Sequence, residues 1–196
     1  MANATALGMS NDLDRLKVLQ YYSNKFERIR VDTSRGFAPH KPILLLSIIE
    51  MIAKGEISEN RIYITKELQD KFFKYWSYLG SESHNPDISR PYFHMKSGKF
   101  WHFIANPGYE KVVTSKIKLK TLAEVKRTIK YVYLDEDLFD FLNEEKYRDS
   151  LLSVLVARWF PGRLEEIRAI SKTHEFRDPP IAMEKIEAKL RAEVTP

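Results

Sequence analysis

One segment of the sequence is apolar on nearly every side, and it restricts the fold more than any other feature. From Ile43 to Ala53 almost every residue is apolar, so a helix formed there has no polar face to turn towards water. Pro42 suits the first turn of such a helix because its missing N–H would have no partner there, and Gly55 lies just past the other end. The sequence therefore predicts a buried helix over 43–53 at the centre of the domain.

Several shorter helices are predicted around this centre. Thr65 is placed to cap a helix that stops at Gly80, and Thr121 with Glu124 has the spacing of a capping box. Two more helices are predicted at about 137–142 and 145–160. A first helix, ending near residue 30, is predicted by three- and four-residue spacing of the apolar residues Leu13, Leu16, Leu19, Tyr22, Phe26 and Ile29.

One segment favours β structure. Residues 93–96, the turn pair Ser97-Gly98 and residues 99–104 predict a β-hairpin. Together with the helices, this hairpin predicts an α+β fold, a predominantly α-helical single domain with a small β-hairpin. The chain of 196 residues, 43% of them hydrophobic, suffices for one well-buried core and not for two.

The predicted domain covers residues 1–162. The remainder, 163–196, is interrupted by Pro179-Pro180 and carries Met183, Ile186 and Leu190 on one helical face. We expect this part to be a peripheral helical tail or a linker towards a further domain.

Cysteine is absent, which excludes disulfides, thiolate metal sites and cysteine nucleophiles. A reducing cytoplasm fits this composition. The first nine residues lack the basic start and apolar run of a secretion signal, and no apolar stretch approaches the length that spans a membrane. The sequence thus predicts a cytoplasmic protein with no membrane contact.

Charge is distributed unevenly along a chain whose formal net charge is +5. Residues 111–130 carry seven basic residues against Glu124, a balance of 7 − 1 = +6, whereas residues 135–149 carry two basic against seven acidic residues, 2 − 7 = −5. The basic stretch is either a solvated helix face or a strip that faces phosphates, and the second interpretation requires it to lie beside a nucleic-acid site.

An enzymatic alternative depends on carboxylates that could hold a metal. Asp87, Glu124 and Lys126 imitate the loose PD-ExK pattern of many restriction nucleases. That pattern places its E-x-K on a buried strand, whereas Glu124 is expected in the first turn of a solvated helix. His94 and His102 would lie on the two arms of the hairpin, but they lack acidic or thiolate partners. The sequence also has no Gly-rich nucleotide cradle, so we predict neither a metal nor a cofactor.

Basic residues converge near the start of the central helix. His40 and Lys41 precede Pro42 at a helix N-terminus, where free N–H groups and the helix dipole favour an anion. Arg90 lies in a polar loop that could approach them. These residues predict a phosphate site, with a purely structural role for Pro42 and a solvated Lys41 as the alternative.

Two stretches about fifty residues apart resemble the paired signature of DNA sulfur-binding domains. The first is Ala38-Pro39-His40-Lys41-Pro42-Ile43-Leu44-Leu45-Leu46, and the second is Pro91-Tyr92-Phe93-His94-Met95-Lys96-Ser97-Gly98-Lys99-Phe100-Trp101. The similarity covers about residues 10–160. Domains of this family bind phosphorothioate-modified DNA and commonly precede an HNH nuclease domain.

The resemblance implies roles for individual residues. Pro91 would contact the sulfur, and His40 with Lys41 would supply the basic pair beside the phosphate. His94 would form part of the cavity wall, and Arg90 stands where the family often has tyrosine, so that its aliphatic stem would cover apolar surface while its head meets a phosphate. Tyr92, Lys96 and Lys99 complete the implied set of DNA contacts.

The resemblance further implies binding without catalysis, because no HNH constellation follows residue 160. The expected partner is double-stranded DNA with a phosphorothioate linkage, in a modification-dependent restriction or sensing system. The resemblance also implies an HNH nuclease domain as a partner if the chain is part of a longer one. Sulfur is larger and less strongly hydrated than the oxygen it replaces, so an apolar cavity would prefer it by about 1–3 kcal/mol, roughly tenfold to a few hundredfold. A regulator that binds unmodified DNA is the remaining alternative.

Overall fold

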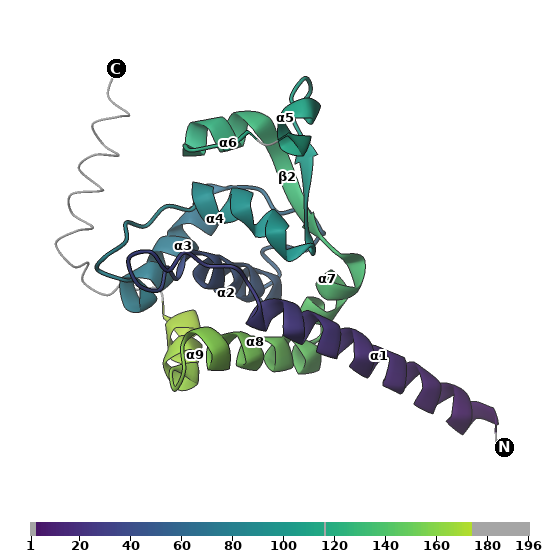
Figure 1. Cartoon of the computed structure of the whole chain (residues 1–196). Coiled ribbons are helices and arrows are strands. Elements are labelled where there is room, and N and C mark those ends of the chain that lie inside the picture. The colour runs from purple at the N-terminus through teal and green to yellow at the C-terminus, as the bar shows by residue number, and fades with distance from the viewer. Residues whose placement is uncertain (1–2, 116, 174–196) are drawn as a thin grey trace.

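Helix α2 (His40–Ala53) runs through the middle of the computed structural model, which describes residues 3–115 and 117–173 (Figure 1). Every residue from Pro42 to Ile52 is buried. The central helix predicted from the apolar run is therefore confirmed. It begins at His40, slightly earlier than predicted, and Gly55 follows its end with a φ of 70°.

Helices surround α2 on several sides. It contacts α3, α4, α7 and α8, and α1 packs along α8. The core includes Ile167 and Ile170 of α9, the last helix among the described residues. The bounds of the helices not yet given are α1 (Asn3–Glu27), α3 (Lys66–Leu79), α4 (Ser89–His94), α5 (Glu110–Thr114), α6 (Leu122–Thr128), α7 (Glu136–Asn143), α8 (Glu145–Trp159) and α9 (Leu164–Lys172).

The predicted helix caps are present. The Thr65 hydroxyl accepts a hydrogen bond from the Leu68 N–H at 3.2 Å, and α3 ends before Gly80. Thr121 and Glu124 form the predicted capping box at the start of α6. These signals are local, so they act in the same way whatever the rest of the chain does.

Helix α1 differs from its prediction at its beginning. It starts at Asn3, and Figure 1 shows its N-terminal half extending away from the body of the molecule. Leu13 and Leu16 are 56% and 54% exposed, so the apolar face that predicted the helix is not buried at this end. Tyr22 and Phe26 are buried, because only the C-terminal part of the helix packs on α8.

A two-stranded antiparallel sheet accompanies the helices, which confirms the predicted α+β class. Strand β1 (Trp101–Ala105) pairs with β2 (Ile129–Leu134), and Trp101 lies opposite Leu134. Ile62 forms an additional antiparallel bridge to Val132 on β2. The two strands are connected by a segment that contains α5 and α6, and not by a tight turn.

The position predicted for the first arm of the hairpin was wrong. Residues 89–94 form α4, and the 3₁₀-helix η1 (Met95–Gly98) follows directly. Pro91 is the third residue of α4, where its missing N–H removes no intrahelical bond. Gly98 lies so close to the buried Phe100 ring that a Cβ would fall 2.6 Å from its nearest atom. His102 lies on β1 opposite Tyr133, whereas His94 lies on α4, so the two histidines do not face each other across a hairpin.

The predicted tail lies largely outside the described residues, including Pro179-Pro180, Met183, Ile186 and Leu190. Within the described part of the chain, no helix is both long enough and apolar enough to cross a membrane.

Candidate nucleic-acid interface

A cavity of about 490 Å³ opens beside the N-terminus of α2. The loop before α4, the helix α4 itself and the segment that precedes α2 complete its walls. Two sequence segments about fifty residues apart therefore meet at one place. The lining residues are Arg30, Val31, Asp32, Arg35, Ala38, His40, Lys41, His84, Asn85, Asp87, Arg90, Pro91 and His94.

His40 is held in the cavity wall by a hydrogen bond and by an aromatic contact. Its Nε2 donates to the Asn85 carbonyl at 2.9 Å, and its ring lies 4.5 Å from that of Trp76. Burial lowers the pKa of His40, although the bond to Asn85 opposes this effect. Because Nε2 is occupied, His40 can donate to a ligand through Nδ1 only when the ring is protonated. Its main contribution near neutral pH is thus to shape the wall.

In the signature stretch that begins at Ala38, Lys41 is a cation that remains available to a ligand. Its Nζ donates to the Ser97 hydroxyl at 3.3 Å, which links α2 to the turn after α4. Burial, with a smaller contribution from the charge of Arg30, lowers the pKa of Lys41 to about 8. Lys41 has no carboxylate partner among residues 3–115 and 117–173. An anion that entered the cavity would find a poorly solvated cation there.

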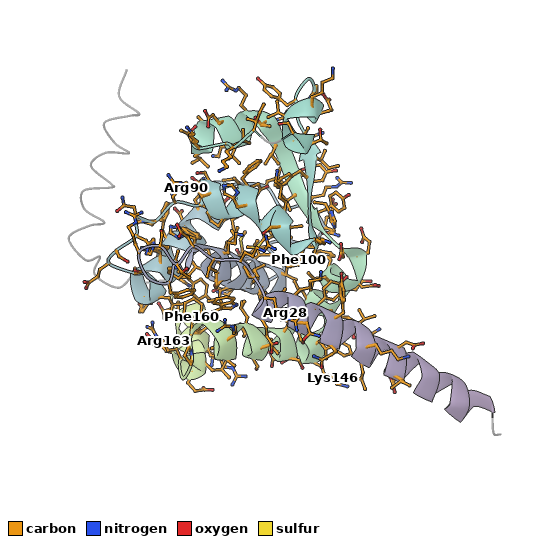
Figure 2. All side chains as sticks on the ribbon, viewed as in Figure 1. Arg28, Arg90, Phe100, Lys146, Phe160 and Arg163 are labelled. Atoms are coloured by element: carbon orange, nitrogen blue, oxygen red, sulfur yellow. The ribbon has the colours of Figure 1, made fainter. Side chains whose placement is uncertain are left out.

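Asp87 organises the start of α4. Its carboxylate accepts hydrogen bonds from the N–H of Ser89 at 2.9 Å and from the Ser89 hydroxyl at 2.5 Å. The other oxygen lies 3.3 Å from Nε of Arg90, whose side chain is 69% exposed. Figure 2 shows Arg90 on α4, far from Lys146 on α8. Asp87 therefore holds the helix start and orients Arg90 without enclosing the guanidinium.

Pro91 and His94 lie three positions apart on α4, a spacing that puts both on one face of the helix. Pro91 is buried and lines the cavity, so its ring is an apolar part of the wall. Burial lowers the pKa of His94, and the charges of Lys41, Lys96, Lys118 and Arg90 lower it further. This region of the wall thus combines a rigid apolar ring with a positive potential.

Three residues of the predicted contact set lie away from the cavity. Tyr92 is 1% exposed, and its hydroxyl donates to the Ile62 carbonyl at 2.6 Å, so it belongs to the core. Nζ of Lys96 lies 4.2 Å from the centre of the Phe93 ring. Lys99 is exposed in a left-handed conformation, with φ 65°, just after η1. None of the three lines the cavity.

Sequence reasoning missed three basic residues that the fold brings to the cavity. Arg30 and Arg35 come from the segment between α1 and α2, and no motif marks them. His84 is only 7% exposed, and its Nδ1 lies 3.0 Å and 3.1 Å from the hydroxyls of Ser83 and Ser81. Its Nε2 is buried and has no hydrogen-bond partner among the described residues. One ring nitrogen of His84 is therefore unsatisfied among the described residues.

The charge of the cavity favours an anion. Four lining residues are lysine or arginine and two are aspartate, a balance of 4 − 2 = +2 before any histidine is protonated. Asp32 accepts a hydrogen bond from the Ser34 N–H at 2.9 Å, and Asp87 is engaged by Ser89 and Arg90. Val31, Ala38 and Pro91 supply the apolar part. The arrangement suits an anion that has one weakly hydrated corner.

The PD-ExK pattern needs a buried strand and metal-binding carboxylates, and its residues Glu124 and Lys126 provide neither. The Glu124 carboxylate accepts hydrogen bonds from the N–H groups of Lys120 and Thr121, so it caps α6. Lys126 is exposed on the same helix and not on a strand. In the part of the chain that the structure describes, no group of three or more histidines or carboxylates is arranged to hold a metal ion.

Comparisons with known proteins bear on the fold. No family model matches the chain, and neither does any curated protein. The fold is similar to that of the sulfur-binding domain of ScoMcrA, solved in complex with phosphorothioated DNA, with a TM-score of 0.54 and 20% identity over 76% of this chain and 97% of that one. A second complex, of the sulfur-binding and SRA domains of ScoMcrA with phosphorothioated DNA, matches with a TM-score of 0.52 and 20% identity over 74% of this chain and 45% of that one.

Proposed function

We propose that this chain binds double-stranded DNA that carries a phosphorothioate linkage and places the sulfur in the cavity beside Pro91. The observation that carries the proposal is that a buried proline ring and a half-buried lysine meet in one cavity, where the lysine has no carboxylate partner among the described residues. The similarity in fold to domains solved with phosphorothioated DNA supports the same ligand.

The two parts of the cavity have different tasks in this proposal. Lys41 and Arg90 attract the negative charge that modified and unmodified linkages share, so they provide affinity for any duplex. Pro91, Val31 and Ala38 offer apolar surface to the one atom that differs. Burying sulfur there costs less desolvation than burying oxygen, which gives the preference.

Catalysis is not part of the proposal. The residues described here offer anion-binding groups and an apolar wall, and the carboxylates near them hold backbone N–H groups or Arg90. The function that we assign is therefore recognition, within a modification-dependent restriction or sensing system.

A competition between otherwise identical duplexes, with and without one sulfur, tests the proposal. We expect a preference of about tenfold to a few hundredfold for the modified duplex, comparable to one discriminating contact. Pro91→Ala should reduce this preference, whereas Pro161→Ala, at an exposed position after α8, should leave it unchanged. Equal binding of both duplexes at all salt concentrations would refute the proposal and would favour a regulator of unmodified DNA.

A further inference from the structure

A second positive region adjoins the cavity. We call residues 106–130, apart from the undescribed residue 116, the basic lobe; it comprises α5, α6, the loop between them and the start of β2. Six of its described residues are cationic and two are acidic, a balance of 6 − 2 = +4. All six cations are exposed: Lys111, Lys118, Lys120, Lys126, Arg127 and Lys130.

The cations of the basic lobe form no ion pair with any described residue, although ion pairs are frequent elsewhere. Lys66 pairs with Asp70 on α3, and Arg168 pairs with Glu165 on α9. Within the lobe, Glu124 is occupied by the cap of α6, and Glu110 accepts a hydrogen bond from the Gly108 N–H at 3.2 Å. An ordinary solvated surface mixes the two signs of charge, so the lobe departs from the pattern of this protein's own surface.

The basic lobe lies next to the helix that forms the cavity wall. Helix α6 packs on α4, and Figure 1 shows the two helices one above the other. Val125 and Thr128 are buried on the inner side of α6, which leaves Lys126 and Arg127 on the outer side. The charge of Lys118 also acts on His94 at the cavity. The cations of the lobe therefore lie on an element next to the cavity wall, and one of them is close enough to influence a cavity residue.

We propose that the basic lobe binds the sugar-phosphate backbone of the same duplex on one side of the modified linkage. This inference rests on the proposed function and extends it, because the cavity accommodates one linkage whereas a duplex presents a phosphate at every step of each strand. Exposed lysine and arginine side chains without partners suit such contacts, since each phosphate neutralised releases a counterion. The lobe would add affinity and fix the direction of the DNA, but it would not read the sulfur.

The experiment compares two variants that lose the same charge. The test variant is Lys118→Gln/Lys120→Gln/Lys126→Gln, and the control variant is Lys17→Gln/Lys66→Gln/Lys146→Gln, at exposed positions on α1, α3 and α8. Each is titrated with a phosphorothioate duplex that extends about 10 base pairs, roughly one helical turn, on both sides of the sulfur. Two further duplexes lack the extension on one side or on the other.

We expect the test variant to lower the salt slope by up to about 2.7, or 0.9 for each of three contacts. Between roughly 50 and 200 mM salt the wild type would then lose up to about 40-fold more affinity than the variant. One truncated duplex should erase this difference, and the other should keep it. The preference for sulfur over oxygen should stay at the wild-type value, because the cavity is intact.

Three outcomes would overturn the inference: a test variant that binds like the wild type, a control variant that loses as much as the test variant, or a loss that is the same with all three duplexes. These outcomes are separate from failure of the proposed function. That failure appears as equal affinity of the wild type for the modified and unmodified duplexes, whatever the lobe variants do.

Discussion

Both ends of helix α2 carry a buried or half-buried charged side chain. Only at one end does that side chain have partners of opposite charge among the described residues. At the C-terminal end, Glu50 is 5% exposed. Its carboxylate accepts hydrogen bonds from Lys54 at 2.7 Å, Lys71 at 3.0 Å and the Tyr75 hydroxyl at 2.6 Å. At the N-terminal end, Lys41 has the Ser97 hydroxyl as its partner and no carboxylate among the described residues.

The C-terminal cluster is closed by a second element. Nζ of Lys74 donates to the carbonyl groups of Ile170 and Thr173, and Nζ of Lys54 donates to that of Ser171. Burial alone would raise the pKa of Glu50, yet the hydrogen bonds from Lys54, Tyr75 and Lys71 bring it below its usual value. The cluster thus fastens the end of α9 to the centre of the domain.

The difference between Glu50 and Lys41 is the difference between a charge that stabilises the fold and a charge that can bind a ligand. A buried ion with a full set of internal partners stabilises the packing and has nothing left for a ligand. A half-buried cation that lacks an anionic partner is poorly satisfied until an external anion arrives. In the proposed function, the open cavity at Lys41 is therefore the binding end of α2, whereas the cluster at Glu50 has a structural role.

Removing the carboxylate at the closed end should have the largest effect. Glu50→Ala leaves the buried Lys74 and the Tyr75 hydroxyl without their partner, so we expect the free energy of unfolding to fall by about 3–5 kcal/mol. Chemical denaturation measures this change. Glu165→Ala, which breaks an exposed pair with Arg168, serves as the control and should cost no more than about 1 kcal/mol. Equal costs for the two variants would contradict the structural assignment of Glu50.

Removing the cation at the open end should weaken binding without affecting the preference for sulfur. Lys41→Ala should lower affinity for modified and unmodified duplexes alike, by about 1.5–3 kcal/mol, or roughly tenfold to more than a hundredfold. The salt slope should fall by about one phosphate contact, or ~0.9. Gel-shift titrations over a range of salt measure both quantities. A loss confined to the modified duplex would show that Lys41 reads the sulfur and not the charge.

The half-buried Lys41 should make binding depend on pH. Its pKa is about 8 in the free protein, and a bound phosphate raises it, so the contribution of Lys41 to affinity is complete below pH 8. The contribution is lost as the pH rises through the higher pKa of the complex, by up to about tenfold per pH unit. Lys41→Arg should flatten the profile between roughly pH 7 and 9, because arginine stays charged. An unchanged profile in this variant would assign the titration to another group.

The smallest effect is expected at His84. His84→Phe removes the Nε2 atom, which has no partner among the described residues, together with the hydrogen bonds between Nδ1 and the hydroxyls of Ser81 and Ser83. Stability should therefore fall by about 0.5–1.5 kcal/mol. If Nε2 donates to the bound backbone, affinity should fall by about 0.5–1.5 kcal/mol, roughly twofold to tenfold. Thermal unfolding and the same titrations give the two numbers. Wild-type affinity in this variant would limit the role of His84 to the wall.

Local signals predicted much of the fold. The apolar run after Pro42, the Thr65 cap and the capping box at Thr121 each depend on residues within one or two helical turns, and all three are present. The first arm of the hairpin, predicted at residues 93–96, was wrong because this stretch is short and because packing against α2 and α6 favours a helix over 89–94. The β-branched and aromatic residues of 129–134 carried a strand signal that the basic residues nearby obscured.

The candidate site was predictable in part. The two signature stretches pointed to His40, Lys41, Pro91 and His94, and the structure places all four at one cavity. Tyr92 carried the same sequence signal, but it faces the core because it lies on the inner side of α4. Because the sequence did not predict α4, it could not show which side of that helix each residue occupies.

The sequence by itself determined a buried central helix, a mainly helical α+β domain and a set of basic residues at the start of that helix. Only the tertiary structure decided which of the charges remain available. Glu50 and Lys41 stand at the two ends of α2, and their neighbours Lys71, Lys74, Ser97 and His84 come from other elements. Whether a charge is satisfied depends on the atoms within hydrogen-bonding distance and on the loss of water, and both are set by packing between segments far apart in the chain.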